Sequence, residues 1–155
     1  MKIVINKCFG GFSLSPKAIK RLAELKGEKC YFFEDKYLDD NRKYIPISLE
    51  EACKNGFSIA FKVNNPDDYI SWKNWNSMSS DERTAINKKY ESIYLTSRPE
   101  DRTDPLLIKV IEELGDEASG SCAELRIVEI PDGIDYEIDE YDGLEHIAEV
   151  HRTWG

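Results

Sequence analysis

The chain has 155 residues, 41% of them hydrophobic, and a formal net charge of −9. This composition provides enough apolar side chains for a core and argues against intrinsic disorder. The acidic balance argues against a nucleic-acid partner, because the phosphate backbone would be repelled. We expect a single α+β domain over residues 1–155, with a largely antiparallel sheet and three or four packed helices.

The negative charge is concentrated in the C-terminal part of the sequence. Residues 116–149 contain twelve acidic residues and one basic residue, Arg126, whereas residues 1–115 contain 18 acidic and 19 basic residues. Because like charges repel at long range, we expect a small anion to bind within residues 1–115.

The cysteines and the apolar runs indicate the compartment. Cys8, Cys30, Cys53 and Cys122 include no C-x-x-C pair and no zinc-ligand spacing with a histidine. We therefore expect free thiols, no bound metal and no cofactor. The N-terminus has no secretory hydrophobic region and no apolar run has the length of a membrane span. These features predict a cytoplasmic protein without a membrane partner.

The first predicted strand, Lys2–Asn6, leads through "KCFGGFSLSP" into a predicted helix. Ser15 is expected to cap this helix, Pro16 to occupy its first position and Gly27 to follow its end. A glycine pair after a strand lets the backbone approach a phosphate closely, and free N–H groups at a helix start attract anions. Alternatively, the glycines only form a tight turn and the flanking phenylalanines belong to the core.

The middle of the chain is less regular. Cys30–Phe33 and Phe57–Val63 are expected to be short strands, the latter with Phe57 and Phe61 on one face. A capping box at Ser48 predicts a short helix between them.

The aromatic segment "DYISWKNWNSMS" is expected to be a loop. Its Trp72 and Trp75 are spaced to lie on one side of a helical turn. They could fill the core, cover a ligand or anchor a subunit interface. Because an exposed tryptophan pair and an open sheet edge are costly in water, we also expect a homo-oligomer.

Two further helices are predicted with clear boundaries. A capping box at Ser79 begins a helix that extends to about Ile93, and Asp104-Pro105 begin another that Gly115 ends.

Arg98 and Arg102 lie just before the second of these helices, in "SRPEDRTDP". Their guanidinium groups match a phosphate or carboxylate, and the helix start adds partial positive charge. Surface salt bridges with Glu100 and Asp101 are the alternative. As loop residues, both arginines are expected to contribute little to stability.

The C-terminal third predicts a three-stranded antiparallel meander. Its expected strands, Ala123–Ile130, Ile134–Tyr141 and Leu144–His151, are separated by turns at Asp132-Gly133 and Asp142-Gly143. In the second strand, Asp135, Glu137 and Asp139 share one face. They could hold a metal in a phosphodiesterase, or form the solvated face of the sheet. No nucleophile elbow or catalytic triad is present in the sequence, so we expect no catalytic residues.

Three segments, "MKIVINKCFGGFSLS", "RTDPLLIKVIEELGDEASGSCAELRIVEIPDG" and "YEIDEYDGLEHIAEVHRTW", together resemble a widespread group of small phage and prophage proteins. Some small phage proteins of this size are sponges, which bind nucleotide-derived signals of bacterial immunity, such as cyclised or amino-acid-linked ADP-ribose, without cleaving them. The resemblance implies a non-enzymatic anti-defence sponge in the host cell cytoplasm, with a small phosphorylated nucleotide-like ligand.

Two alternatives from other functional classes stay open. The protein could be an acidic inhibitor that mimics DNA or occupies a basic host protein, or it could be a metal-dependent phosphodiesterase. For the sponge, the expected ligand-binding residues are Asn6, Phe9, Gly10, Gly11, Phe12, Ser13, Trp72, Trp75, Arg98 and Arg102.

Overall fold

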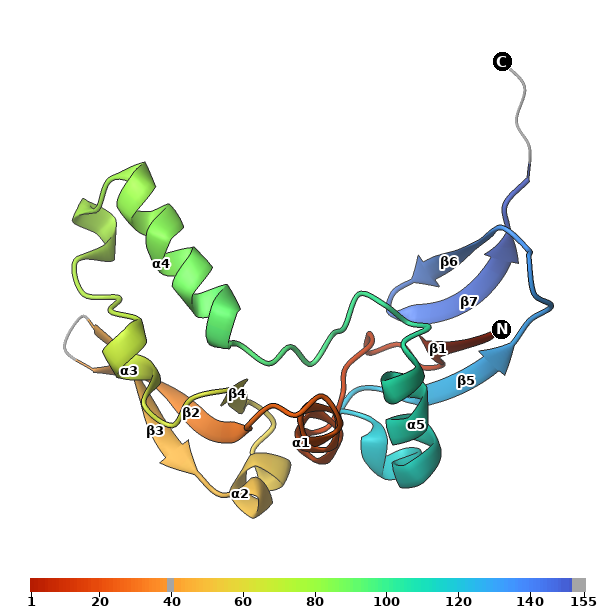
Figure 1. Ribbon diagram of the computed structural model, residues 1–155, viewed down its shortest axis with the longest axis horizontal. Coiled ribbons are helices and arrows are strands. Elements are labelled where there is room, and N and C mark those ends of the chain that lie inside the picture. Colours follow the sequence, from red (N-terminus) through yellow and green to blue (C-terminus); the bar gives the residue numbers. More distant parts are fainter. Residues whose placement is uncertain (39–40, 152–155) are drawn as a thin grey trace. The chain divides into compact units, whose positions relative to one another are not determined.

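A computed structural model of the protein describes residues 1–38 and 41–151 (Figure 1). The chain divides into two units: unit 1 comprises Met1–Leu22 and Ser97–Gly155, and unit 2 comprises Ala23–Thr96. Helices accompany antiparallel strand pairs in both, which confirms the expected α+β class. The single domain stays a prediction.

Unit 1 is built on the antiparallel pair of β1 (Lys2–Asn6) and β5 (Leu125–Glu129), with Val4 opposite Ile127. Helix α5 (Pro105–Leu114) contacts both strands and is followed by the 3-10 helix η2 (Gly115–Ala118). The N-cap of α5 is the expected one, since Asp104 accepts a hydrogen bond from the Leu106 amide at 2.8 Å.

Helix α1 (Pro16–Leu25) also has the expected ends. The Ala18 amide donates to the Ser15 hydroxyl at 3.2 Å, and Gly27 follows with a φ of 72°. Within unit 1, Arg21 connects α1 to α5 through two hydrogen bonds to the Glu113 carboxylate, at 2.7 and 3.2 Å.

The C-terminal hairpin has two strands, β6 (Tyr136–Tyr141) and β7 (Leu144–Glu149). The expected three-stranded meander is therefore wrong: the strand expected at 123–130 is β5, and it pairs with β1. Pairing with β1 builds the sheet on fully buried apolar side chains such as Ile3 and Val4, whereas β6 presents an exposed acidic face.

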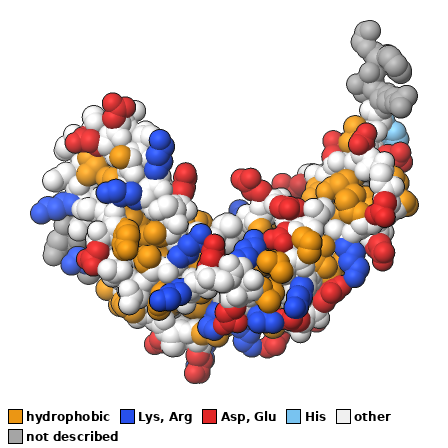
Figure 2. Space-filling view, viewed as in Figure 1, with side chains coloured by type: hydrophobic (Ala, Val, Ile, Leu, Met, Phe, Trp, Pro, Cys, Tyr) orange, Lys and Arg blue, Asp and Glu red, His pale blue; other side chains and the backbone are white. Residues whose placement is uncertain are grey.

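The acidic face of β6 agrees with its interpretation as the solvated face of a sheet. Glu137, Asp139 and Tyr141 are exposed, while Tyr136 and Ile138 on the other face are half-buried. Figure 2 shows acidic and hydrophobic side chains next to each other over this hairpin. This pattern is that of a strand with one solvated face.

Unit 2 contains a three-stranded antiparallel sheet in the order β3–β2–β4, formed by β3 (Asn41–Ile47), β2 (Tyr31–Leu38) and β4 (Ile59–Phe61). The β2–β3 hairpin extends well beyond the short strand expected at Cys30–Phe33. The strand expected at 57–63 is shorter than predicted. Because β4 begins only at Ile59, Phe57 lies outside the sheet and is 95% exposed.

Two helices of unit 2 begin where the sequence predicts. Helix α2 (Leu49–Lys54) and helix α4 (Ser80–Ile93) both have complete capping boxes, at Ser48 and Ser79. The aromatic segment expected to be a loop overlaps helix α3 (Pro66–Tyr69) and contains the 3-10 helix η1 (Trp75–Ser77). No helix among the described residues has both the length and the apolar content of a membrane span.

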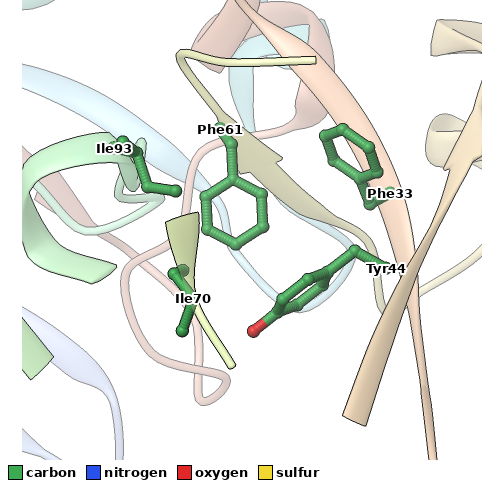
Figure 3. Close-up of a cluster of buried hydrophobic side chains, with 5 residues drawn as sticks. All are labelled: Phe33, Tyr44, Phe61, Ile70 and Ile93. Atoms are coloured by element: carbon green, nitrogen blue, oxygen red, sulfur yellow. The ribbon is translucent and has the colours of Figure 1, made fainter. Parts of the chain in front are cut away.

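An aromatic cluster forms the core of unit 2. Figure 3 shows the Phe61 ring between Ile93 on one side and Phe33 and Tyr44 on the other. The Tyr44 and Phe61 rings meet edge to face, with their centroids 4.9 Å apart. Half-buried aromatic side chains, Trp72 among them, pack against this cluster and extend it toward the surface.

Candidate functional site

A cavity of about 380 Å³ lies in unit 2, beside the aromatic core. Its volume and its largely aromatic walls are typical of small-molecule sites. The lining residues are Tyr37 of β2, Arg42 of β3, and Trp72, Trp75 and Asn76 from the segment between α3 and α4.

The two tryptophans are adjacent and half-buried at this cavity. Their ring centroids lie 5.2 Å apart at an interplanar angle of 55°. The Trp72 indole N–H donates to the Tyr44 hydroxyl at 2.9 Å, which fixes the ring against the core. Burial raises the pKa of Tyr44, so its hydroxyl stays neutral and available as the acceptor at neutral pH.

Arg42 provides the positive charge of the cavity wall. Its Nε donates to both carboxylate oxygens of Asp35, and its Nη2 donates to one of them. These bonds raise the pKa of Arg42 above its already high usual value, so the group is permanently charged. The guanidinium carbon lies over three aromatic rings, 5.9 Å from the centroid of Tyr37, 5.6 Å from that of Tyr44 and 5.2 Å from that of Trp72.

One edge of this guanidinium group is available. Among the described residues, Nη1 of Arg42 has no hydrogen-bond partner, since the bonds to Asp35 use Nε and Nη2. An N–H donor on a charged group beside aromatic walls is suited to an anionic substituent of a planar ligand.

Arg83 of α4 binds the main chain of the segment that carries Trp75 and Asn76. Its Nε donates to the Trp75 carbonyl at 3.0 Å and its Nη2 to the Asn76 carbonyl at 3.1 Å. Its guanidinium carbon lies 5.5 Å from the centroid of the Trp75 ring. No carboxylate of the described residues forms an ion pair with Arg83, so its charge adds to the positive potential there.

The glycine loop, expected to approach a ligand, also lies close to other segments of the chain. A Cβ at Gly10 would lie 1.7 Å from the Cys122 carbonyl oxygen, and a Cβ at Gly143 would lie 2.3 Å from the Gly11 nitrogen. Around Gly11 itself there is open space, and its φ of 81° favours glycine.

Asn6 is fully buried and its side chain joins β1 to neighbouring segments of unit 1. Its amide nitrogen donates to the Cys8 carbonyl at 2.7 Å and to the Gly143 carbonyl at 2.6 Å. Its amide oxygen accepts from the Glu124 amide at 2.8 Å. These bonds use both ends of the side-chain amide within the protein.

Arg102 is half-buried in unit 1. Its guanidinium carbon lies 3.3 Å from the centroid of the buried Phe12 ring, and its Nη2 donates to Glu145 at 3.4 Å. The other oxygen of Glu145 accepts from the main-chain N–H of Asn6 at 2.8 Å. Burial lowers the pKa of Arg102, and the charge of exposed Arg98 lowers it further, whereas Glu145 opposes both. Arg102 is thus more enclosed than the surface salt bridges with Glu100 and Asp101 would require, and its effect on stability stays a prediction.

The predicted ligand-binding residues therefore fall into two groups. Trp72 and Trp75 line the unit 2 cavity, whereas the other eight belong to unit 1, where Phe9 is 67% exposed and Ser13 is half-buried. The sequence analysis missed Tyr37, Arg42, Asn76 and Arg83. The segments "EDKY" and "NRKY" each place a tyrosine after three charged or polar residues, and neither has the alternation that would have marked a half-buried strand.

Comparisons with protein-family models, with curated proteins and with solved structures find no match. Among the described residues, no group of three or more His, Cys, Asp or Glu side chains is arranged to hold a metal ion.

Proposed function

We propose that this protein binds and sequesters a small nucleotide-derived ligand at the unit 2 cavity without transforming it. The observation that carries the proposal is the cavity itself, where three aromatic side chains stand beside the permanently charged Arg42. Aromatic rings stack on the faces of nucleobases, and each such contact contributes about 1–3 kcal/mol. The guanidinium group would meet the phosphate.

The charge distribution also favours unit 2 for an anionic ligand. Unit 2 has 11 basic and 13 acidic residues, whereas unit 1 has 10 basic and 17 acidic residues. A phosphate would therefore be repelled less by unit 2. At the cavity, Asp35 compensates Arg42 while Arg83 adds positive charge.

The lining groups support binding rather than catalysis. The five residues include no carboxylate, histidine, cysteine or serine, which are the side chains that most often act as general base or nucleophile. A protein that holds a nucleotide signal intact has the properties of a sponge. The proposal includes what the resemblance to phage proteins implies, which is action against a defence signal in the host cytoplasm. It also includes a homo-oligomer.

Titration calorimetry with adenosine 5′-monophosphate (AMP) tests the site. We expect Trp75→Ala to weaken binding by roughly tenfold or more, because one stacking contact is lost. Phe57→Ala is the matched control, since it removes an exposed aromatic ring of unit 2 outside the cavity. Failure of AMP to bind at millimolar concentration, or equal effects of the two variants, would contradict the proposal.

A second measurement separates sequestration from catalysis. The protein is incubated with ADP-ribose and then denatured by heat, and the released material is identified by mass spectrometry. Intact ADP-ribose is expected. Hydrolysis products would instead favour the phosphodiesterase alternative.

A further inference from the structure

Asn76 provides an unengaged amide at the wall of the cavity. The hydrogen bond that involves this residue uses its main-chain carbonyl, which accepts from Arg83. Its side chain is exposed and forms no hydrogen bond with any described residue. The amide is therefore free to pair with a ligand.

The main chain that carries this amide is held from two sides. Asn76 directly follows Trp75 in η1, and Arg83 binds the carbonyls of both residues. Trp75 in turn lies against Trp72, which is hydrogen-bonded to the core residue Tyr44. The amide is thus attached to the same short segment as the ring on which a base would stack.

A side-chain amide matches one purine edge better than another. It offers an acceptor, Oδ1, next to a donor, Nδ2–H. Adenine has a donor, the N6 amino group, next to an acceptor, N7, so both hydrogen bonds form together. Guanine and hypoxanthine present two acceptors, O6 and N7, on this edge, which leaves Oδ1 facing an oxygen lone pair.

We infer that Asn76 reads the N6–N7 edge of an adenine base that stacks on the Trp72–Trp75 pair, and that the cavity therefore selects adenine nucleotides. This inference rests on the proposed function, which requires only that a nucleotide binds there. It adds the identity of the base, adenine, and the residue, Asn76, that distinguishes adenine from other purines.

Calorimetry with three matched ligands tests the inference. AMP has both groups of the edge, inosine 5′-monophosphate (IMP) replaces the N6 amino group by an oxygen, and 7-deaza-AMP replaces N7 by a carbon. We expect the unaltered protein to bind AMP roughly tenfold more tightly than either analogue, the discrimination typical of one bidentate amide–base pair.

The variant Asn76→Asp tests the residue itself. A carboxylate still accepts from N6 but repels the N7 lone pair, so AMP binding should weaken by roughly tenfold, whereas 7-deaza-AMP binding should weaken much less. Asn55→Asp is the matched control, because it makes the same charge change at the exposed end of α2, away from η1 (Figure 1).

The possible failures are distinguishable. If the three ligands bind equally well while Trp75→Ala still weakens them, the base-reading role of Asn76 is wrong and the proposed function stands. If Asn76→Asp and Asn55→Asp weaken AMP binding equally, the effect is one of net charge and the inference is also wrong. If none of the three nucleotides binds at millimolar concentration, both proposals are contradicted.

Discussion

Each unit of the protein contains an arginine that pairs with a carboxylate and lies over an aromatic ring. In unit 1, Arg102 pairs with Glu145, and their side chains are 17% and 8% exposed. In unit 2, Arg42 pairs with Asp35, and both side chains are 25% exposed. Glu145 is also bonded to the main chain of β1, whereas Arg42 borders an open cavity.

This difference shows that residue type alone does not predict which arginine borders a cavity. An arginine, a carboxylate and an aromatic ring pack together in unit 1, and the same three groups lie beside a cavity in unit 2. What distinguishes them is the space next to the guanidinium group, which is filled in one unit and open in the other.

The largest effect that tests this comparison is expected from Glu145→Ala. The substitution leaves half-buried Arg102 and the buried main-chain N–H of Asn6 without their acceptor, and we expect a loss of about 3 kcal/mol in the free energy of unfolding of unit 1. Asp35→Ala should cost only about 1 kcal/mol, because water in the cavity can solvate Arg42.

Urea denaturation measures the free energy of unfolding of both variants. Hydrogen exchange at the main-chain N–H of Asn6 measures the local effect in unit 1. Faster exchange is expected in Glu145→Ala alone. Equal losses of stability in both variants would show that the two arginine pairs are equally enclosed, and the comparison would fail.

The glycines provide a second test. Gly10→Ala should destabilise unit 1 by about 2 kcal/mol, because the new methyl group would overlap the Cys122 carbonyl and the backbone must move. Gly56→Ala in unit 2 is the control, since its added Cβ would have no atom within 4 Å apart from its neighbours in the chain. A Gly10→Ala protein with unchanged thermal stability would mean that this loop adapts, and would restore it as a candidate for ligand approach.

The smallest effects are expected on the stability of the two units at acid pH. The Ser79 hydrogen bonds lower the pKa of Glu82 in unit 2, and the Arg21 bonds lower that of Glu113 in unit 1. A carboxylate with a lowered pKa in the folded state stabilises the protein above its ordinary pKa, and this stabilisation is lost as the pH falls through the lowered value.

We therefore expect Glu82→Gln to reduce the acid sensitivity of unit 2 alone, and Glu113→Gln that of unit 1 alone. Thermal melts between neutral and acid pH, followed by NMR signals from each unit, provide the measurement. Changes that appear in both units from either variant would show that the units do not unfold independently.

Local signals in the sequence predicted the helices better than the sheets. Helix starts at Ser15, Ser48, Ser79 and Asp104 depend on residues within one turn, and all four are present. The pairing of β1 with β5 could not be predicted in the same way, because it joins segments more than a hundred residues apart and depends on which strands can bury an apolar face.

The candidate site was also only partly predictable from local sequence signals. The spacing of Trp72 and Trp75 predicted that the two side chains lie on one side of the segment, and their rings are indeed adjacent. Arg42 was missed because its hairpin carries many charged residues and even a proline, Pro46, and so lacks the alternation of a half-buried strand. Arg98 and Arg102 matched the pattern of an anion site, but the burial of Arg102 depends on Glu145, which lies far away in the sequence.

The division of the chain also has a consequence for its synthesis. Unit 2 is one continuous stretch, whereas unit 1 joins residues from both flanks of that stretch. On the ribosome, unit 2 can complete its contacts first, while β1 has already emerged and must wait for β5 and β7. During that interval the apolar residues Ile3, Val4 and Ile5 have no partner strand. These three side chains therefore stay outside their buried environment until the C-terminal part of the chain has been synthesised.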